Sequence, residues 1–285
     1  MADTLNQHTH EPGHAHTHEP GHAHTHEPAH AHDHGHGATF DYSEIPPGYY
    51  DQVMRDGPAI QRAWHRQKFA RVREAVELPP QGRILDVGCG PGSFLGSYDL
   101  TQGSAPAELV GMDIATDQIA YANEHYGTAT RRFVTVGAEE DWPFEAGHFD
   151  AVTVIEVVEH LYPDQIRSIF DRAANVLKPN GMVVVTTPNY ASHWPILERL
   201  IARRSAVSYH EQHITHFNRF TVKKRLGEIA GERYRWDGAT TMHFVAPFLA
   251  PLSKRFSDGV ASRVTPRHWT WPFGALIIAR LRLKG

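Results

Sequence analysis

The sequence predicts an α/β fold in which one mostly parallel sheet is covered by helices on both faces. Short apolar runs that suit buried strands alternate with longer segments of helical periodicity, as in strand–helix–strand units with right-handed crossovers. A glycine-rich turn follows the first of these strands at Gly88, Gly90 and Gly92. In folds of this class ligands bind at the carboxyl ends of the strands, so we expect a binding crevice at that turn.

Five short apolar segments are predicted to be the parallel strands: 84–87, 109–113, 133–136, 149–155 and 182–187. Helical periodicity is predicted for residues 59–76, 116–126, 163–177 and 220–230. Residues 234–245 and 273–283 then form a closing pair of strands, which brings the predicted sheet to seven. The length of 285 residues suits one such domain with appendages.

The turn after the first strand carries the strongest ligand signal. Asp86 lies near the strand end, and glycines occupy the alternate positions 88, 90 and 92. Glycine permits positive φ and lets a ligand approach the backbone, while the free N–H groups of a helix opened by Ser93 face the same crevice. The spacing differs from the G-x-G-x-x-G of dinucleotide sites, and it predicts a nucleotide-like ligand.

The composition excludes several classes of protein. Cys89 is the single cysteine, so no disulfide framework can form and a reducing cytoplasm is expected. The sequence has no apolar run long enough to span a membrane, and we expect no secretion signal because the basic and apolar regions of one are missing.

Residues 1–37 form a separate tail in which the pattern His-Thr-His-Glu-Pro-Gly-His-Ala recurs from His8 onward. The tail holds 12 of the 22 histidines, five acidic residues and no Lys or Arg. Because it offers almost no apolar side chains to a core, we expect it to be disordered. Its imidazoles suit transition metals as partners, whether that affinity serves the protein or is incidental.

Charge is unevenly distributed along the rest of the chain. Removing the five acids of the tail from the total of 32 leaves 27 acidic residues against 28 basic ones. From Arg199 onward there are 16 Lys and Arg against 5 Asp and Glu. Such a bias suits an anionic substrate, a membrane surface or RNA, and it is also what an ordinary solvated surface can show.

The stretch Leu85-Asp-Val-Gly-Cys-Gly-Pro-Gly92 resembles the first motif of the class I S-adenosylmethionine (SAM)-dependent methyltransferases, and the resemblance extends over roughly 81–231. It implies a Rossmann-like sheet of seven strands whose last strand inserts antiparallel, with SAM bound beside Asp86, Gly88, Gly90 and Gly92. It further implies N-terminal helices over 38–80 that cap the SAM pocket, and a SAM-binding domain over 81–285 with an insertion at 189–217. Within the capping helices, Arg66 or Lys68 either meets the methionine carboxylate of SAM or is a surface charge.

Two acidic residues are further candidates for binding the cofactor. Asp113 ends the second strand and matches the family position that accepts both ribose hydroxyls; the alternative is that it caps the helix over 116–126. Many relatives place an acid directly after the glycine that follows the third strand, where it meets the adenine amine. This sequence has Ala138 there, so either Glu139 substitutes or the backbone alone contacts adenine.

A group of titratable residues follows the fourth strand at the catalytic edge of the sheet. If the chain turns helically there, Glu156, Glu159 and His160 share one face, and their spacing suits half of a divalent-metal site. We predict that His216 completes the site around Mg²⁺, Mn²⁺, Co²⁺ or Zn²⁺. Without metal, His160 or one of His213 and His216 serves as the general base, and both routes favour O-methylation.

Two methyltransferase families resemble this pattern. The ubiquinone-biosynthesis O-methyltransferases share a similar Glu-Val-x-Glu-His sequence and a membrane-facing insertion, which here corresponds to the apolar and basic segment 194–204. The small-RNA 3′-terminal 2′-O-methyltransferases carry Glu-x-x-Glu-His and a distant His. The predicted function is O-methylation of a small or lipid-like hydroxylated acceptor, with possible peripheral membrane contact. The alternatives are the RNA 3′ end and a metal-buffering protein with a vestigial SAM fold.

Overall fold

The computed structural model describes residues 45–101, 105–202, 213–263 and 273–285. The chain divides into two units, Met1–Ala38 and Thr39–Gly285, and all described residues belong to the second. The disorder predicted for residues 1–37 therefore concerns a segment outside the described residues.

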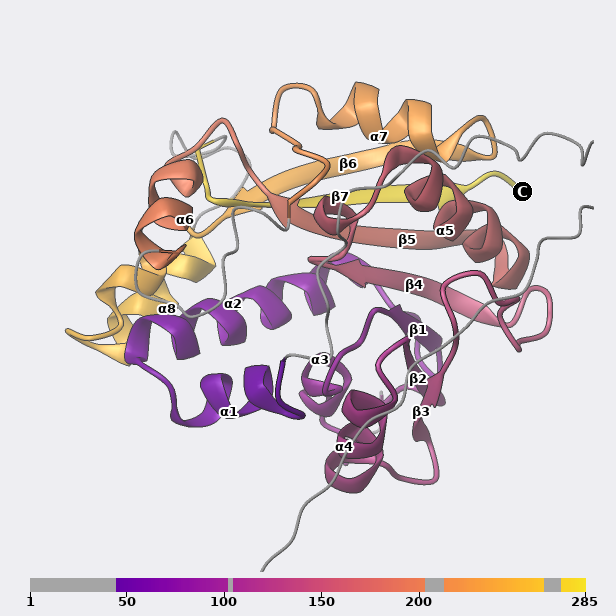
Figure 1. Ribbon diagram of the computed structural model, residues 1–285, viewed down its shortest axis with the longest axis horizontal. Helices are drawn as coiled ribbons and strands as arrows, with labels where there is room; N and C mark the ends of the chain where they lie inside the picture. Colours follow the sequence, from indigo (N-terminus) through magenta and orange to yellow (C-terminus); the bar gives the residue numbers. More distant parts are fainter. Residues whose placement is uncertain (1–44, 102–104, 203–212, 264–272) are drawn as a thin grey trace, which may run out of the picture. The chain divides into compact units, whose positions relative to one another are not determined.

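A seven-stranded sheet forms the centre of the second unit, with the strand order β3-β2-β1-β4-β5-β7-β6 (Figure 1). Its strands are β1 (Arg83–Val87), β2 (Glu108–Asp113), β3 (Arg131–Thr135), β4 (Phe149–Ile155), β5 (Leu177–Pro188), β6 (Tyr234–Met242) and β7 (Leu276–Leu283). The pairs among β1 to β5 are parallel, whereas β7 runs antiparallel to both β5 and β6. The predicted sheet, including its antiparallel last strand, is confirmed.

Helices cover both faces of this sheet because its strands are apolar on both sides. In β5, Val183 and Val185 join one core cluster, while Val184 joins the other. The first cluster includes Phe170 of α5 (Pro163–Val176) together with α7 (Val222–Ala230), and the second includes Val72 of α2 (Ala59–Val76) together with α4 (Thr116–Tyr126). Alternate side chains along one strand thus supply two separate cores, as the continuous apolar runs predict.

Two helices that the sequence pattern did not predict are held by tertiary contacts. In α1 (Tyr49–Asp56), the buried Asp51 accepts hydrogen bonds from the hydroxyls of Ser93 and Tyr121, each at 2.8 Å. In α8 (Lys254–Arg263), the hydroxyl of Ser257 accepts a hydrogen bond from Gln67 of α2 at 2.9 Å. Both helices are short and polar, so their position depends on these partners more than on their own periodicity.

The fifth strand begins earlier than its apolar run indicates. Leu177 already pairs with Phe149, the register then shifts, and Met182 pairs with Ala151. The four residues between them, which separate the predicted helix over 163–177 from the predicted strand over 182–187, form an irregularity within β5 in which Asn180 has a φ of 62°. The helix that Ser93 opens, α3 (Ser93–Gly96), is by contrast a single turn.

The crevice predicted at the strand ends lies where the strand order reverses. β1 has β2 on one side and β4 on the other, so the carboxyl ends of β1 and β4 meet at a topological switch point. The glycine turn follows β1, and the short 3₁₀ helix η2 (Val158–His160) follows β4. Within the described ranges, no helix combines the length and the apolar character that crossing a bilayer demands.

Candidate active site

Different structural requirements explain the three glycines of the turn after β1. All three have positive φ, of 70°, 50° and 77° for Gly88, Gly90 and Gly92. A Cβ at Gly88 would lie 2.5 Å from Cγ2 of Val157, and one at Gly92 would lie 2.7 Å from the ring of Phe133. A Cβ at Gly90 would meet nothing within 4 Å. Gly88 and Gly92 therefore shape the turn, and Gly90 exposes backbone to open space where a ligand can approach.

Asp113 connects the end of β2 to this turn. Its Oδ2 accepts a hydrogen bond from the Gly90 N–H at 2.8 Å, and its Oδ1 accepts one from the Ala115 N–H at 3.0 Å. The N-cap position of α4 is Ala115, so Asp113 does not cap that helix. Burial raises the pKa of Asp113. A carboxylate has about four acceptor sites, so those not used by the backbone remain available to ribose hydroxyls.

Asp86 lies beneath the turn rather than in it. Its side chain is 2% exposed, and its Oδ1 accepts a hydrogen bond from the Thr153 hydroxyl at 2.6 Å. Burial raises the pKa of Asp86 to about 7, since the bond from Thr153 only partly offsets the loss of water. Asp86 therefore links β1 to β4 through Thr153, and its carboxylate carries an energetic cost when charged.

The loop after β3 places its two glutamates differently. Glu139 is exposed. The carboxylate of the next residue, Glu140, accepts a hydrogen bond from the Gly137 N–H at 3.0 Å. Glu140 thus closes the turn, whereas the carboxylate of Glu139 stays exposed to solvent.

Lys68 is buried, so it is not the surface charge that was one of the two expectations. It reaches from α2 to the carboxylate of Glu156 at the end of β4, and its side chain is 4% exposed. Glu156 has a φ of 53°. Burial acts to raise the pKa of Glu156, but the charge and hydrogen bond of Lys68 outweigh it and hold the pKa below its usual value. Arg66, the other candidate, pairs with Asp258 at 2.5 Å.

The left-handed backbone at Glu156 changes the geometry predicted for this segment. The helical turn that follows comprises only Val158–His160, so Glu156 does not share one helical face with Glu159 and His160. The structure instead brings Glu159, His160 and His213 together: ligand atoms of these three residues all lie within 4.8 Å of one another. Among the described residues, this group includes neither Glu156 nor His216.

Glu159 is the most buried member of this group. Its side chain is 1% exposed, and its Oε2 has no hydrogen-bond partner among the residues that the structure describes. Burial, followed by the nearby Glu156, raises the pKa of Glu159 well above its usual value. A buried carboxyl oxygen without a partner is costly, and such atoms are common where a ligand, a metal ion or a proton transfer compensates.

His213 and His216 follow α6 (Trp194–Ala202) in the chain and have different environments. The backbone N–H groups of Ile214 and Thr215 donate to the Glu159 carbonyl at 2.7 and 3.0 Å, which anchors the loop beside η2. The Tyr190 hydroxyl lies 2.7 Å from Nδ1 of His213. The ring of His216 stacks on Tyr190 instead, with centroids 4.1 Å apart.

Aromatic rings extend from this group to α2. The His160 and His213 centroids are 4.9 Å apart, Trp194 lies 6.4 Å from His213, and Trp64 of α2 lies 5.8 Å from Trp194. The indole Nε1 of Trp194 is buried without a hydrogen-bond partner among the described residues. We therefore interpret this row of rings as a wall of the acceptor site, in which the indole N–H can meet a polar group of the acceptor.

Two histidines of this region, His243 and His65, were not identified from the sequence. His243 has a φ of 64°, is 4% exposed and stacks against Trp64 with centroids 4.0 Å apart. Burial holds the pKa of His243 well below its usual value and lowers that of His65 to about 3. Both imidazoles are therefore neutral at physiological pH. Their positions depend on the packing of α2 against the end of β6, for which the sequence carries no local signal.

Comparison with known proteins places these features in a family. The sequence profile of a family described as a methyltransferase domain matches residues 60–231. A fatty-acid O-methyltransferase of Mycolicibacterium smegmatis is 34% identical over 120 residues, which are 42% of each chain. A ubiquinone biosynthesis O-methyltransferase of Bradyrhizobium sp. is 34% identical over 125 residues, 43% of this chain and 46% of the relative. The matched part spans less than half the length of these curated relatives.

Two further similarities agree with the fold. A malonyl-[acyl-carrier protein] O-methyltransferase of Legionella pneumophila is 33% identical over 139 residues, 48% of this chain and 45% of that protein. A solved SAM-dependent methyltransferase from Archaeoglobus fulgidus superimposes with a TM-score of 0.51 at 18% identity, covering 86% of this chain and all of that one. At that identity the structural similarity establishes the fold alone.

Proposed function

The chain belongs to the family of methyltransferase domains, and on that premise we propose that it transfers a methyl group from SAM to an oxygen atom of a small or lipid-like hydroxylated molecule. The observation that carries this proposal is the group of Glu159, His160 and His213 beside the glycine turn. Val157, which leads into this group, contacts Gly88 of the turn. A hydroxyl acceptor needs a group to receive its proton, and an imidazole at this position can do so.

The residues around the turn fit SAM. The open space above Gly90 admits the methionine end of the cofactor to the backbone, and Gly88 and Gly92 keep the turn in its left-handed conformation. Asp113 can accept ribose hydroxyls, and Glu139 lies in the loop expected on the adenine side. When bound, SAM supplies an electrophilic methyl group on its sulfonium. Asp86 links β1 to β4 through Thr153.

The acceptor class is supported by the wall of the site and by the names of the relatives. Trp64 and Trp194 line the side opposite the sheet, and the exposed Ile196 lies on α6. These apolar groups suit an acceptor with an apolar body. The curated relatives described above carry names of O-methyltransferases for a fatty acid, for ubiquinone biosynthesis and for a malonyl acyl-carrier protein. Membrane contact through residues 194–204 stays a prediction, as does metal binding by the tail.

His160 is our candidate general base, and a divalent metal is the second way in which this site can assist the reaction. The predicted ligands Glu156, Glu159, His160 and His216 are better replaced by Glu159, His160 and His213, whose ligand atoms converge. When Nδ1–H of His213 donates to the Tyr190 hydroxyl, Nε2 presents its lone pair to the group. A metal held there would supply charge stabilisation for an acceptor oxygen. Two imidazoles and one carboxylate suit Mn²⁺, Co²⁺ or Zn²⁺ better than Mg²⁺.

Methyl transfer from tritiated SAM tests this function directly. The protein without residues 1–37 avoids metal bound by the tail, and it is offered a fatty acid, a catechol with a prenyl chain, a malonyl thioester and an oligoribonucleotide. We expect label on an oxygen of one of the first three. Label on the oligoribonucleotide alone, or on none, would contradict the proposal. Activity that is lost in a chelator and restored by Mn²⁺ or Zn²⁺ would favour the metal, and unchanged activity would leave His160 as the base.

A further inference from the structure

A basic cavity lies on the side of α2 away from Glu156. Its volume is about 510 Å³, and its lining residues come from α1, α2, the residue after α3 and the segment leading into α8. Five of its lining residues are cationic: Arg55, Arg62, Arg66, Arg73 and Lys254. A cavity of this size is in the range of small-molecule sites.

The spacing of residues along α2 separates this cavity from the proposed active site. Arg62, Arg66, Phe69 and Arg73 follow one another at intervals of four, three and four residues, so they share one helical face. Lys68 points to a different side of the same helix, where it pairs with Glu156. The ring of Phe69 lies between this cavity and the Lys68 ammonium, which is 5.4 Å from the ring centroid, so a ligand in the cavity need not contact the Lys68–Glu156 pair or take part in the proposed methyl transfer.

The positive charges exceed the carboxylates that pair with them. Asp258 accepts from Arg66 at 2.5 Å and lies 3.9 Å from Lys254, and Asp51 lies 3.4 Å from Arg55. Asp51 is fully buried and already accepts hydrogen bonds from three hydroxyls of its surroundings. Five cations against two paired carboxylates leave an excess of three positive charges around one cavity.

Two of the arginines have no carboxylate partner in the described part of the chain. Arg62 is exposed at the rim. Arg73 is half-buried, donates to the hydroxyl of Ser97 and lies over the ring of Tyr98. A guanidinium presents a planar set of donors that matches phosphate oxygens in pairs, and four of the five cations are arginines. The charge and the donor geometry together favour a ligand with at least two negative charges.

Apolar side chains complete the lining. Met54 of α1 and Phe69 of α2 face the same cavity as the cations. Free inorganic anions gain nothing from such a surface, whereas the organic part of a phosphate or diphosphate ester does. We propose that this cavity binds a phosphate- or diphosphate-bearing molecule, with its anionic group on Arg62, Arg66 and Arg73 and its apolar part on Met54 and Phe69.

Calorimetry with inorganic pyrophosphate as the probe tests the anion site on the full-length protein. The titration is made in metal-free buffer at pH 8, where the histidines of the tail are neutral and do not attract the probe. We expect one binding event, weakened about tenfold in Arg62→Gln/Arg73→Gln because two charged donors are lost. The matched control is Lys223→Gln/Lys284→Gln, which removes two exposed charges elsewhere and should leave affinity unchanged.

A second arm identifies the source of the phosphate. Phosphatidylcholine vesicles with and without phosphatidic acid are sedimented with the wild type and both double variants. Binding that needs phosphatidic acid and the two arginines, without pyrophosphate binding, assigns a lipid headgroup; pyrophosphate binding that needs the two arginines, without vesicle binding, assigns a soluble phosphate or diphosphate group. If Arg62→Gln/Arg73→Gln loses stability, Arg62→Gln alone, at an exposed position, should still weaken binding about threefold. Absence of binding in both arms, or equal weakening by the control variant, would overturn the proposal.

Discussion

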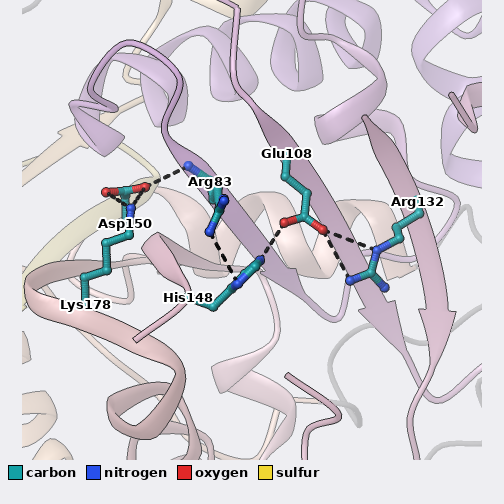
Figure 2. A network of polar contacts seen from close by, with 6 residues as sticks. All are labelled: Arg83, Glu108, Arg132, His148, Asp150 and Lys178. Atoms are coloured by element: carbon teal, nitrogen blue, oxygen red, sulfur yellow. Dashed lines mark hydrogen bonds and ion pairs between the residues drawn. The ribbon is translucent and has the colours of Figure 1, made fainter. Parts of the chain in front are cut away.

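The amino and carboxyl edges of the sheet differ in how their carboxylates are paired. At the amino edge, Glu108 lies 2.6 Å from His148 and 3.3 Å from Arg132, and both oxygens of Asp150 lie 2.8 Å from Lys178 (Figure 2). At the carboxyl edge, Asp86 and Glu159 are almost fully buried, and Oε2 of Glu159 has no hydrogen-bond partner in the described ranges. The amino edge pairs its carboxylates, whereas the carboxyl edge pairs Glu156 with Lys68 and keeps Asp86 and Glu159 buried at an energetic cost.

The pKa directions follow the same division. At Glu108, burial acts to raise the pKa, but the hydrogen bond and charge of His148 and the charge of Arg132 outweigh it and lower the pKa. Burial raises the pKa of Asp86 to about 7 and that of Glu159 well above its usual value. Buried carboxyl groups with raised pKa values are common at functional sites, because selection for stability alone would pair such a group or replace it with an apolar residue. The comparison teaches that the carboxyl edge is arranged for a ligand and the amino edge for the fold.

The largest expected effect is a loss of kcat, which a substitution at the carboxyl edge should cause and one at the amino edge should not. His160→Ala should lower kcat by about 10² to 10⁴-fold, the usual contribution of a general base, with SAM affinity unchanged. Glu108→Gln at the amino edge, the matched control, should leave kcat within about twofold while lowering the melting temperature. Steady-state methyl transfer on both variants makes the comparison, and equal losses of kcat would remove the distinction between the edges.

Cofactor affinity provides the next contrast. Asp113→Ala should weaken SAM binding by about 1 to 3 kcal/mol, since ribose hydroxyls and the Gly90 N–H lose an acceptor. Asp150→Ala removes a carboxylate of β4 at the opposite edge of the sheet, and it should leave SAM affinity unchanged. Calorimetric titration with SAM measures both. Unchanged affinity in Asp113→Ala would show that Asp113 serves only the backbone of the turn.

The pH dependence of stability should have opposite signs for Asp86 at the carboxyl edge and Glu108 at the amino edge. Asp86 has a folded pKa of about 7, above the ordinary value of 3.8, so its stabilising contribution is complete below 3.8 and is lost as pH rises towards 7. Asp86→Asn, which keeps an acceptor for Thr153, should therefore raise the free energy of unfolding at pH 8 by about 1 to 3 kcal/mol without ligand.

Glu108 at the amino edge provides the control for the pH dependence that Asp86 gives to the free energy of unfolding. The depressed pKa of Glu108 means that its contribution is present above its ordinary value of 4.5 and is lost as pH falls through the folded pKa. Glu108→Gln should consequently lower the free energy of unfolding above pH 4.5 and flatten the acid side of the stability curve, without adding a slope between pH 5 and 8. Urea unfolding of ligand-free protein across this range measures both slopes. A destabilised Asp86→Asn at pH 8 would be the opposite of what burial requires.

The smallest effect concerns residues 1–37. Their deletion should remove several weak transition-metal sites and change neither the melting temperature nor SAM affinity, because a segment with almost no apolar side chains adds nothing to a core. Calorimetry with Ni²⁺ and a metal-free melting curve test the two parts separately. A large fall in the metal-free melting temperature would show that the tail packs on the domain.

Local patterns predicted most of the fold. The strand β4 and the helices α2 and α4 have the predicted bounds, because their apolar residues follow one period from end to end. The helices α1 and α8 were missed, since Asp51 and Ser257 hold them through partners far along the chain. The lengthened β5 was missed for a similar reason: Leu177 is in the strand because Phe149 pairs with it.

The site was predictable in its location and less so in its pairings. The motif located Gly88, Gly90 and Gly92, and the strand-end rule placed Glu159 and His160 at the same edge. The partner of Glu156 was not predictable, because Lys68 lies 88 positions earlier and reaches it only through packing of α2. Nor could the spacing of residues in the sequence decide which of His213 and His216 joins the group. The Tyr190 hydroxyl lies beside Nδ1 of His213, whereas the Tyr190 ring stacks on that of His216.

A crystal structure of the full chain with S-adenosylhomocysteine tests the central claim most directly. The claim is that the carboxyl edge joins a cofactor site at the glycine turn to the group of Glu159, His160 and His213. The predicted result has the ribose hydroxyls on Asp113 and the cofactor sulfur facing the His160 imidazole across a gap that one acceptor oxygen can fill. A cofactor whose sulfur is separated from that group by protein side chains would contradict the claim.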